Sequence, residues 1–312
     1  MATHQGALRI IATGRYVPDL VVTNDDLSHI VDTSDDWITS RTGISERRVA
    51  FLEATSDLAS KAAEAAIRQG HFDKTQIDLI IVATFTPDLR SPSVASLVQM
   101  KLGLNHLNII AFDINAACTG FVYALNIADK MLNSGAYHYA LVIGAEVISK
   151  VTDYTDRNTC VLFGDGAGAM ILCHDPQKVA YFNVASRGDG DQILYVDDTV
   201  HMDGQKVFQF AAKVFSETIQ ELLKMGRIII ETIKKIIPHQ ANLRIIQHAA
   251  KTLDVPMDRF FINIQKYGNT SAASIPIAFA ELAENDELMS GDQVIFVGFG
   301  AGLTWGSCLL TL

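Results

Sequence analysis

The sequence predicts an α/β fold made of two related halves, and three observations support this prediction. Short apolar runs rich in Ile and Val alternate with alanine-rich stretches of helical character. The apolar runs are continuous, which is typical of strands covered by helices on both faces of a sheet. Similar segments also recur at one constant separation along the chain. Strands that alternate with helices favour largely parallel pairing.

Four runs are expected to form buried strands, and one segment is expected to form a helix. The strand runs lie at residues 79–85, 139–145, 233–239 and 294–300. The helix is predicted for SDLASKAAEAAIRQG at residues 56–70, with Ser56 as its N-cap and Gly70 as its stop.

The recurrence of similar segments indicates a duplicated strand–helix unit. Three pairs of like residues share a separation of 155 positions, as in 272 − 117 = 155: Ala117 and Ala272, Val142 and Val297, and Val82 and Ile237. The two halves are expected to comprise residues 1–172 and 173–312. Because no Pro-, Ser- or Gly-rich linker separates them, they are expected to share one continuous core.

Composition and charge limit the kinds of macromolecule that the protein is expected to bind. The 312 residues are 49% hydrophobic and 19% charged, as in an ordinary globular protein. The formal net charge is −10, and no run is rich in Lys or Arg. Nucleic acid is therefore not an expected partner, because phosphate binding needs a concentrated basic face. An acidic macromolecule would need a local basic patch on which to dock.

Short motifs bear on location and on metal binding. The N-terminal MATHQGALRIIATG lacks the regions of a signal peptide, and the apolar runs are too short to span a membrane. We therefore expect a cytoplasmic protein without membrane insertion. No HExxH, Walker motif or Asp/His cluster occurs, so no metal site is expected. The four cysteines form no CxxC pair and are expected to be reduced cytosolic thiols: Cys118, Cys160, Cys173 and Cys308.

Cys118 lies where a strand-like run becomes a helix, in AFDINAACTGFVYALNIADKML at residues 111–132. The N-terminus of a helix stabilises a thiolate and lowers its pKa. The small residues around Cys118 would let a bulky substrate approach the sulfur. An inert buried cysteine is the alternative reading, and we keep it for the other three cysteines. Apolar residues follow Cys118 at helical spacing: Phe121, Leu125, Ala128 and Leu132.

His239 is the histidine with the most distinctive context. In IIPHQANLRIIQHAAK it ends a predicted strand and precedes a helix, with Pro238 stiffening the turn and Asn242 one turn further on. Polar side chains at the carboxyl ends of strands are where α/β sites usually form. A capping or core histidine is the alternative reading.

Asn269 is the third candidate, in FINIQKYGNTSAASIPIAFAEL. Gly268 permits an unusual backbone conformation, and the Asn-Thr-Ser sequence that follows it is a natural helix cap. Capping alone would also explain Asn269.

Two glycine-rich segments resemble nucleotide-binding loops only superficially. GFGAGLTWG at residues 298–306 and FGDGAGA at 163–169 are each followed by a strand-like run. A dinucleotide fingerprint requires a helix there, so this interpretation is rejected. Glycines between two strands instead predict a tight turn whose backbone N–H groups approach a ligand.

Taken together, these segments resemble the β-ketoacyl-acyl carrier protein synthase III family of the thiolase superfamily. The resemblance covers nearly the whole chain. It implies the duplicated five-layer αβαβα thiolase fold, with two mixed, mostly parallel sheets, and a homodimer. Six ordered motifs carry it: VDTSDDWITSRTGISERR (31–48), DINAACTGFVYAL (113–125), DRNTCVLFGDGAGA (156–169), IPHQANLRII (237–246), NIQKYGNTSAASIPIA (263–278) and GFGAGLTWGS (298–307).

The resemblance implies a Cys118–His239–Asn269 triad, with Cys118 as the nucleophile. It also implies an oxyanion hole formed by the backbone N–H groups of Cys118 and Ala301. Relatives more often have glycine at position 301, and alanine fits there if its φ is negative. The implied activity is decarboxylative condensation of an acyl-CoA primer with malonyl-acyl carrier protein, without a cofactor. This is the initiating step of type II fatty-acid synthesis.

The resemblance also implies binding positions around the triad. Trp37 and Arg157 would stack the CoA adenine, Thr33 and Arg41 would contact its base and phosphates, and Asn242 would line the pantetheine tunnel. Arg244 and Lys251, seven residues apart on one helix face, would dock the acidic carrier protein.

Three departures from the family pattern stand out. Gln209 replaces a residue that is often basic, and a small Ser91 at the acyl-pocket position hints at primers longer than acetyl. The segments 195–205 and 224–236 look shortened.

Two alternative functions stay open at this point. One is an acyltransferase of specialised metabolism that passes the acyl group to another nucleophile without decarboxylation. The other is a non-catalytic paralogue that binds acyl-CoA.

Overall fold

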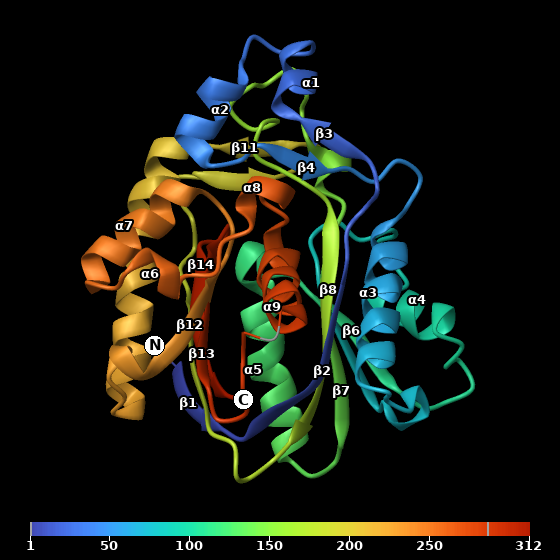
Figure 1. The fold of residues 1–312 in the computed structure, drawn as a ribbon. Helices are drawn as coiled ribbons and strands as arrows, with labels where there is room; N and C mark the ends of the chain where they lie inside the picture. Colours follow the sequence, from blue (N-terminus) through green and yellow to red (C-terminus); the bar gives the residue numbers. More distant parts are fainter. Residues whose placement is uncertain (1, 286) are drawn as a thin grey trace.

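The structure is a computed structural model that describes residues 2–285 and 287–312. Its elements form five layers, helix–sheet–helix–sheet–helix (Figure 1). Helices α5 and α9 lie between the two sheets, α3 and α4 cover the outer face of one sheet, and α6 and α7 cover the other. The bounds of these helices are Thr55–Gln69 (α3), Val94–Lys101 (α4), Gly120–Asn133 (α5), Gly204–Gly226 (α6), Leu243–Leu253 (α7) and Ser274–Glu284 (α9).

Each half of the chain builds most of one five-stranded sheet. The first sheet has the order β2-β8-β7-β5-β6, with strands Leu8–Tyr16 (β2), Leu79–Ala83 (β5), Ile110–Ile114 (β6), Tyr139–Glu146 (β7) and Gly166–His174 (β8). The second has the order β1-β9-β14-β13-β12, with strands Ala2–Gly6 (β1), Ala180–Ser186 (β9), Ile233–Pro238 (β12), Gln293–Gly300 (β13) and Thr304–Thr311 (β14). The expected boundary between residues 172 and 173 falls inside β8, and β1 pairs with β9 in the second sheet.

A small cap covers one end of these layers (Figure 1). Its elements are the strands Val21–Thr23 (β3), Glu46–Arg48 (β4), Leu194–Val196 (β10) and Val200–Met202 (β11), and the helices Asn24–Ser28 (α1), Asp35–Thr42 (α2) and Ile264–Tyr267 (α8). The segment 195–205, for which the sequence predicted no structure, contributes the β10–β11 hairpin. The segment 224–236 ends α6 and, through a short 3-10 turn at Ile230–Thr232, begins β12.

The expected strands and the mixed character of the sheets are confirmed, but the expectation of mostly parallel pairing is wrong. Three of the eight pairings in the two large sheets are parallel, β5–β6, β5–β7 and β12–β13, and the others are antiparallel. The cause is the connections: a parallel pair needs a long crossover, whereas a turn of three residues returns β13 directly into antiparallel β14.

The internal duplication is real in the structure, but its separation is 154 residues and not 155. The first residues of β5 and β12, of β7 and β13, and of α5 and α9 each differ by 154, as in 293 − 139 = 154. Alanine- and valine-rich runs look alike when shifted by one position, so composition could not fix the register. Close contacts do fix it: a Cβ on Gly144 would lie 2.3 Å from the carbonyl oxygen of Ala272, and one on Gly298 would lie 3.3 Å from that of Cys118.

We expect Gly144→Ala to destabilise the protein. The added methyl group would meet backbone of the opposite half, which cannot yield as a flexible side chain can. The expected loss is about 1–3 kcal/mol of unfolding free energy, measured by urea denaturation. Gly188→Ala is the matched control, because a Cβ there would meet nothing within 4 Å. Equal stability of the two variants would contradict this view of the interface between the halves.

The helix predicted at 56–70 is confirmed with one change at its start. α3 begins at Thr55, and its N-cap is Ala54. Ser56 lies in the first turn, where its hydroxyl donates to the Asp88 carboxylate (2.6 Å). Gly70 is the C-cap, as expected.

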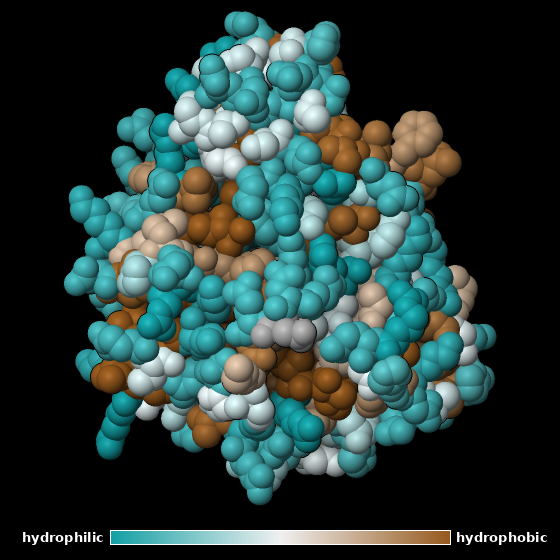
Figure 2. Space-filling model, viewed as in Figure 1, coloured by the Kyte–Doolittle hydropathy of each residue, from teal (hydrophilic) through white to brown (hydrophobic). Residues whose placement is uncertain are grey.

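The face of the molecule in Figure 2 is largely hydrophilic, and its hydrophobic residues gather in small clusters. Within the described residues, no helix combines the length and apolarity needed to cross a membrane.

Candidate active site

A pocket of about 790 Å³ opens at the end of the layers that faces the cap. Its lining comes from both halves of the chain and from the cap. Cys118, His239 and Asn269 all line it, so the structure brings the three sequence candidates together. The β10–β11 hairpin contributes further lining residues: Leu194, Val196, Val200 and Met202.

Cys118 lies in a 3-10 turn, Ala117–Thr119, that leads directly into α5. Ala117 has φ of +46° there, which turns the chain sharply before the helix. Gly300 at the end of β13 lies against this turn, because a Cβ on it would be 2.8 Å from the Cys118 nitrogen. The predicted position of Cys118 at a helix N-terminus is therefore confirmed. The end of β13 packs against the turn that holds Cys118.

The expected depression of the Cys118 pKa is wrong. Burial raises the pKa of the thiol to about 12, and the nearby Glu146 carboxylate acts in the same direction. The Ser271 hydroxyl and the backbone N–H of Cys118 act in the opposite direction, more weakly. Removal of water from around the sulfur thus outweighs the polar groups at the helix start.

His239 follows the last residue of β12 and is 1% exposed. Its backbone N–H donates to the Val297 carbonyl (2.7 Å), and its ring packs edge-on against Phe299. Nδ1 lies 2.7 Å from the Ser274 hydroxyl, which also accepts the Gln240 backbone N–H (3.3 Å). With Nδ1 engaged in this way, Nε2 is left for the pocket. Burial lowers the pKa of His239 to about 3, so the ring is neutral near pH 7.

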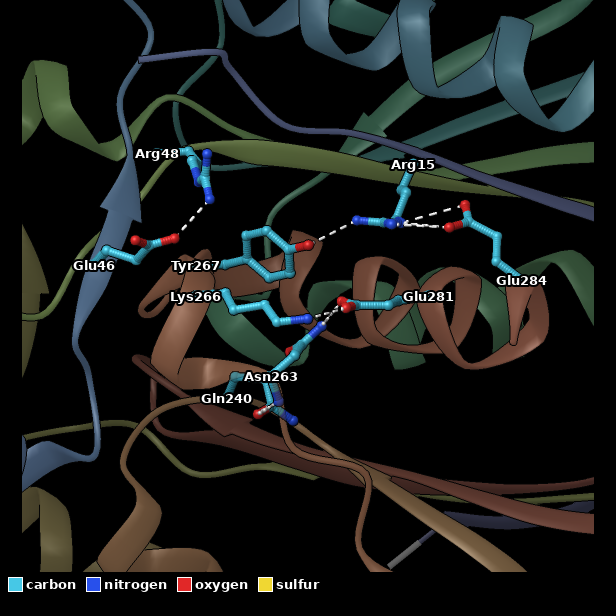
Figure 3. A network of polar contacts seen from close by, with 9 residues as sticks. All are labelled: Arg15, Glu46, Arg48, Gln240, Asn263, Lys266, Tyr267, Glu281 and Glu284. Carbon is cyan, nitrogen blue, oxygen red and sulfur yellow. Dashed lines mark hydrogen bonds and ion pairs between the residues drawn. The ribbon is translucent and has the colours of Figure 1, made fainter. Parts of the chain in front are cut away.

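Gln240, the residue after His239, belongs to a polar network that holds this loop in place (Figure 3). The Gln240 side-chain amide donates to the Pro238 carbonyl (2.8 Å), and its oxygen accepts the Asn263 backbone N–H (3.2 Å). Asn263 in turn donates to Glu281 of α9 (2.9 Å), and Lys266 pairs with the same carboxylate (2.8 Å). The loop after β12 is therefore tied to α9, whose first residue, Ser274, contacts the His239 ring.

Asn269 is held by its backbone and by one end of its side chain. Its N–H donates to the Leu162 carbonyl (2.8 Å), and Oδ1 accepts the Ser271 N–H (2.9 Å). Gly268 has φ of +63°, and a Cβ there would lie 2.8 Å from the Leu162 oxygen, so a glycine is needed. Because Oδ1 is engaged, the Nδ2 end of the amide is the end left to face the pocket.

The two expected oxyanion-hole residues, Cys118 and Ala301, both line the pocket. Ala301 lines the pocket beside Cys118 and begins the tight turn between β13 and β14. It is not among the non-glycine residues with positive φ, so the condition for alanine at this position is met.

Of the residues expected to bind CoA, Trp37, Arg41 and Asn242 line the pocket, whereas Arg157 and Thr33 do not. Arg41 and Arg157 stack on the Trp37 ring, with guanidinium carbons 4.6 and 4.9 Å from the ring centroid. Trp37 and Arg41 line the pocket, as does Asn242, which caps α7 and donates to the Arg41 carbonyl (3.1 Å). Thr33 is not among the lining residues, and its buried hydroxyl lacks a hydrogen-bond partner among the described residues.

The expected carrier-docking residues lie on the exposed side of α7. Arg244 donates to the Ser40 carbonyl through Nε (3.1 Å) and Nη2 (2.8 Å), so it also joins α7 to α2. Lys251 is exposed in the last turn of α7, and Gln209 is exposed on neighbouring α6. Ser91 is exposed in the segment between β5 and α4, away from the pocket lining.

Sequence reasoning missed four residues that shape the site. Ser271 and Phe85 line the pocket, Ser274 holds the His239 ring, and Glu146 lies buried behind the Cys118 turn. The two serines lie three residues apart in the segment NTSAAS, at the start of α9. That spacing is the only sequence signal for these two serines, and it is also compatible with simple helix capping.

Comparisons with known proteins agree with this site. Residues 112–190 match the family model described as 3-oxoacyl-[acyl-carrier-protein (ACP)] synthase III, and residues 224–312 match its C-terminal model. The β-ketoacyl-[acyl-carrier-protein] synthase III of Acholeplasma laidlawii (strain PG-8A) is 50% identical over 307 residues, which covers 98% of each chain. The corresponding protein of Clostridium acetobutylicum is 48% identical over 321 residues, covering 97% of this chain and 98% of that one.

Solved structures show the same relationship. The crystal structure of 3-oxoacyl-[acyl-carrier-protein] synthase III from Aquifex aeolicus VF5 has a TM-score of 0.95 and 45% identity, and covers 98% of this chain and 100% of that one. The corresponding protein from Thermus thermophilus has a TM-score of 0.92 and 40% identity, with coverage of 97% and 98%. Because relatives this similar extend over almost the entire chain, the protein belongs to the β-ketoacyl-[acyl-carrier-protein] synthase III family, with its thiolase fold.

Proposed function

We propose that this protein catalyses the initiating condensation of type II fatty-acid synthesis. An acyl-CoA primer and malonyl-acyl carrier protein would give 3-oxoacyl-acyl carrier protein, CoA and carbon dioxide. The convergence of Cys118, His239 and Asn269 on one pocket, from both halves of the chain, is the observation that carries this proposal.

In the first half-reaction, Cys118 attacks the acyl-CoA thioester. A thioester bond to Cys118 forms, the bond to CoA sulfur breaks, and CoA leaves as the thiol. The negative charge on the carbonyl oxygen would be stabilised by the backbone N–H groups of Cys118 and Ala301. Burial disfavours a free thiolate, so the thiol proton must leave as the sulfur attacks the thioester.

In the second half-reaction, His239 and Asn269 act as hydrogen-bond donors. A neutral His239 with Nδ1 engaged presents Nε2–H, and Asn269 presents its Nδ2 group. Two donors at the malonyl thioester carbonyl stabilise the enolate that remains when carbon dioxide leaves. The enolate carbon then attacks the acyl-Cys118 carbonyl, and the Cys118 sulfur departs. These steps use the chain's own groups and need no cofactor.

Trp37 is proposed to hold the adenine end of CoA, together with Arg41, Arg157 and Thr33. Two guanidinium groups stacked on an indole ring suit a π-faced base next to phosphates. Asn242 also lines the pocket, and the pantetheine arm is proposed to pass it.

Trp37→Ala is expected to raise the KM for acyl-CoA about tenfold while leaving kcat within about twofold. The reason is that one stacking surface, worth about 1–3 kcal/mol, is lost away from the reacting atoms. Steady-state kinetics with acyl-CoA varied measures this effect, and the KM for malonyl-carrier protein is the internal control. An unchanged KM for acyl-CoA would rule out Trp37 as a CoA contact.

The further partners follow from the same proposal. Malonyl-acyl carrier protein is acidic, and Arg244 and Lys251 are proposed as its docking cations despite the net charge of −10. A homodimer is proposed in which Ser91 of one subunit lies at the acyl pocket of the other, where its small side chain would leave room for primers longer than acetyl. We propose a cytoplasmic location, where both substrates are made.

The proposal is tested by product analysis with acyl-CoA and malonyl-acyl carrier protein. The expected products are 3-oxoacyl-carrier protein and one carbon dioxide per CoA released. CoA release without carbon dioxide, with the acyl group on another nucleophile, would favour plain acyl transfer. No CoA release would favour a binding protein.

A further inference from the structure

The Ser271 side chain is a buried polar group that the proposed mechanism leaves unused. Ser271 is 1% exposed, lines the pocket, and has φ of +49° in the turn Ser271–Ala273 that precedes α9. Its hydroxyl has no geometrically satisfactory hydrogen-bond partner among the described residues. It is nevertheless close enough to lower the pKa of two groups, the Cys118 thiol and the Glu146 carboxyl. An unpartnered buried hydroxyl between two titratable groups is a costly arrangement in a protein interior.

Glu146 is fully buried at the end of β7, and its donors approach mainly one oxygen. Oε2 accepts from the Thr84 hydroxyl (3.0 Å), the Thr86 hydroxyl (2.5 Å) and the Thr86 N–H (3.2 Å). Oε1 accepts the Phe85 N–H (3.3 Å), which is also within reach of Oε2 (3.2 Å). The less satisfied oxygen is therefore the one with capacity to gain or lose a proton.

The fold brings Glu146 to Ser271 through a close approach of the two halves. Gly144 of β7 lies directly against Ala272, where any larger residue would clash with backbone. The turn that holds Ser271 contacts both β7, which ends in Glu146, and the turn that holds Cys118. The titratable side chains placed around the thiol are Glu146 from β7 and His239 from the end of β12.

We propose that the Ser271 hydroxyl and the Glu146 carboxylate form the path by which the Cys118 thiol loses its proton. The inference rests on the proposed role of Cys118 as the nucleophile. As the S–H bond breaks, its proton passes to Ser271 Oγ, and the Ser271 proton passes to Glu146. The result is a Cys118 thiolate that accepts a hydrogen bond from Ser271, which in turn accepts one from protonated Glu146. When Cys118 leaves the acyl group in the condensation step, the thiolate can take the proton back.

The ionisation behaviour of the groups agrees with this path. Burial raises the pKa of Glu146 to about 8, so a minor fraction of the carboxyl is ionised near neutral pH, and this ionised form is the one that accepts the Cys118 proton. Burial lowers the pKa of His239 to about 3, so its ring is a poor proton acceptor there. A thiolate beside a carboxylate would be unfavourable, so once Glu146 is ionised, Cys118 and Glu146 are expected to hold one proton between them.

The test is the rate at which iodoacetamide alkylates Cys118, followed by intact mass from about pH 6 to about pH 10. We expect Glu146→Gln and Ser271→Ala each to lower the rate at pH 7 at least about tenfold. Ser271→Gly is a second variant without the hydroxyl, and glycine tolerates the positive φ if alanine disturbs folding. Ser216→Ala is the matched control, because it removes another buried, unpartnered serine hydroxyl, in α6, and should leave the rate unchanged.

The sign of the change for Glu146→Gln decides between two roles. If Glu146 were only a negative neighbour, its removal would lower the thiol pKa and raise the alkylation rate. A raised or unchanged rate in Glu146→Gln, or an unchanged rate in both Ser271 variants, would overturn the proposal. Alkylation needs neither CoA nor carrier protein, so failure of this path is distinguishable from failure of the proposed function, in which wild-type Cys118 would take no acyl group.

Discussion

Cys118→Ala is expected to abolish condensation, with kcat/KM reduced by on the order of 10⁴–10⁶. Its sulfur is the proposed nucleophile, and alanine cannot form the acyl thioester. Intact mass after incubation with acyl-CoA should show the acyl adduct on the wild-type chain and none on the variant. Cys173→Ala, at the partly exposed end of β8, should acylate like the wild type.

The same variant should retain the other partial reaction. His239 and Asn269 are intact in Cys118→Ala, so decarboxylation of malonyl-carrier protein should continue and give acetyl-carrier protein. Release of carbon dioxide without condensation is the expected signature. An acyl adduct on Cys118→Ala would refute the assignment of the nucleophile.

His239→Ala and Asn269→Ala are expected to show the converse pattern. Each removes one donor to the enolate, so decarboxylation of malonyl-carrier protein should fall by about 10²–10³. Acylation of Cys118 should stay within about tenfold of wild type, because the neutral His239 ring is not required to take the thiol proton. Carbon dioxide release and the acyl adduct measure the two reactions separately.

The controls for this pair are a distant histidine and the first half-reaction itself. His106→Ala, at an exposed position after α4, should leave both reactions unchanged. If His239→Ala lost acylation as severely as decarboxylation, His239 would be the base for Cys118, and the division of roles between the two half-reactions would be wrong.

Much of the fold could be predicted from the sequence because its signals are local. Continuous apolar runs located β5, β7, β12 and β13 to within two residues at each end. Other features depend on contacts between distant segments. The direction of β8 and β14 and the one-residue register of the repeat are set by how the two halves pack, which the periodicity of one run does not specify.

The same distinction between local signals and contacts of distant segments applies to the residues of the site. Cys118, His239 and Asn269 each lie at a junction between a strand or turn and a helix, and motif resemblance joined them. Ser271 and Glu146 could not be paired from the sequence, because they lie 125 residues apart (271 − 146 = 125) and meet only through the close approach at Gly144. The three-residue spacing of Ser271 and Ser274 is compatible with simple helix capping, so it did not indicate a site.

The central claim is that one sulfur accepts the primer and then passes it to a malonyl-derived carbon. A single-turnover experiment tests this most directly: the acyl adduct is formed with acyl-CoA, free acyl-CoA is removed, and malonyl-acyl carrier protein is added while the intact mass is followed. The account predicts that the adduct on Cys118 disappears as 3-oxoacyl-carrier protein appears in equal amount. An adduct that persists, or that is lost without formation of the 3-oxoacyl product, would contradict it.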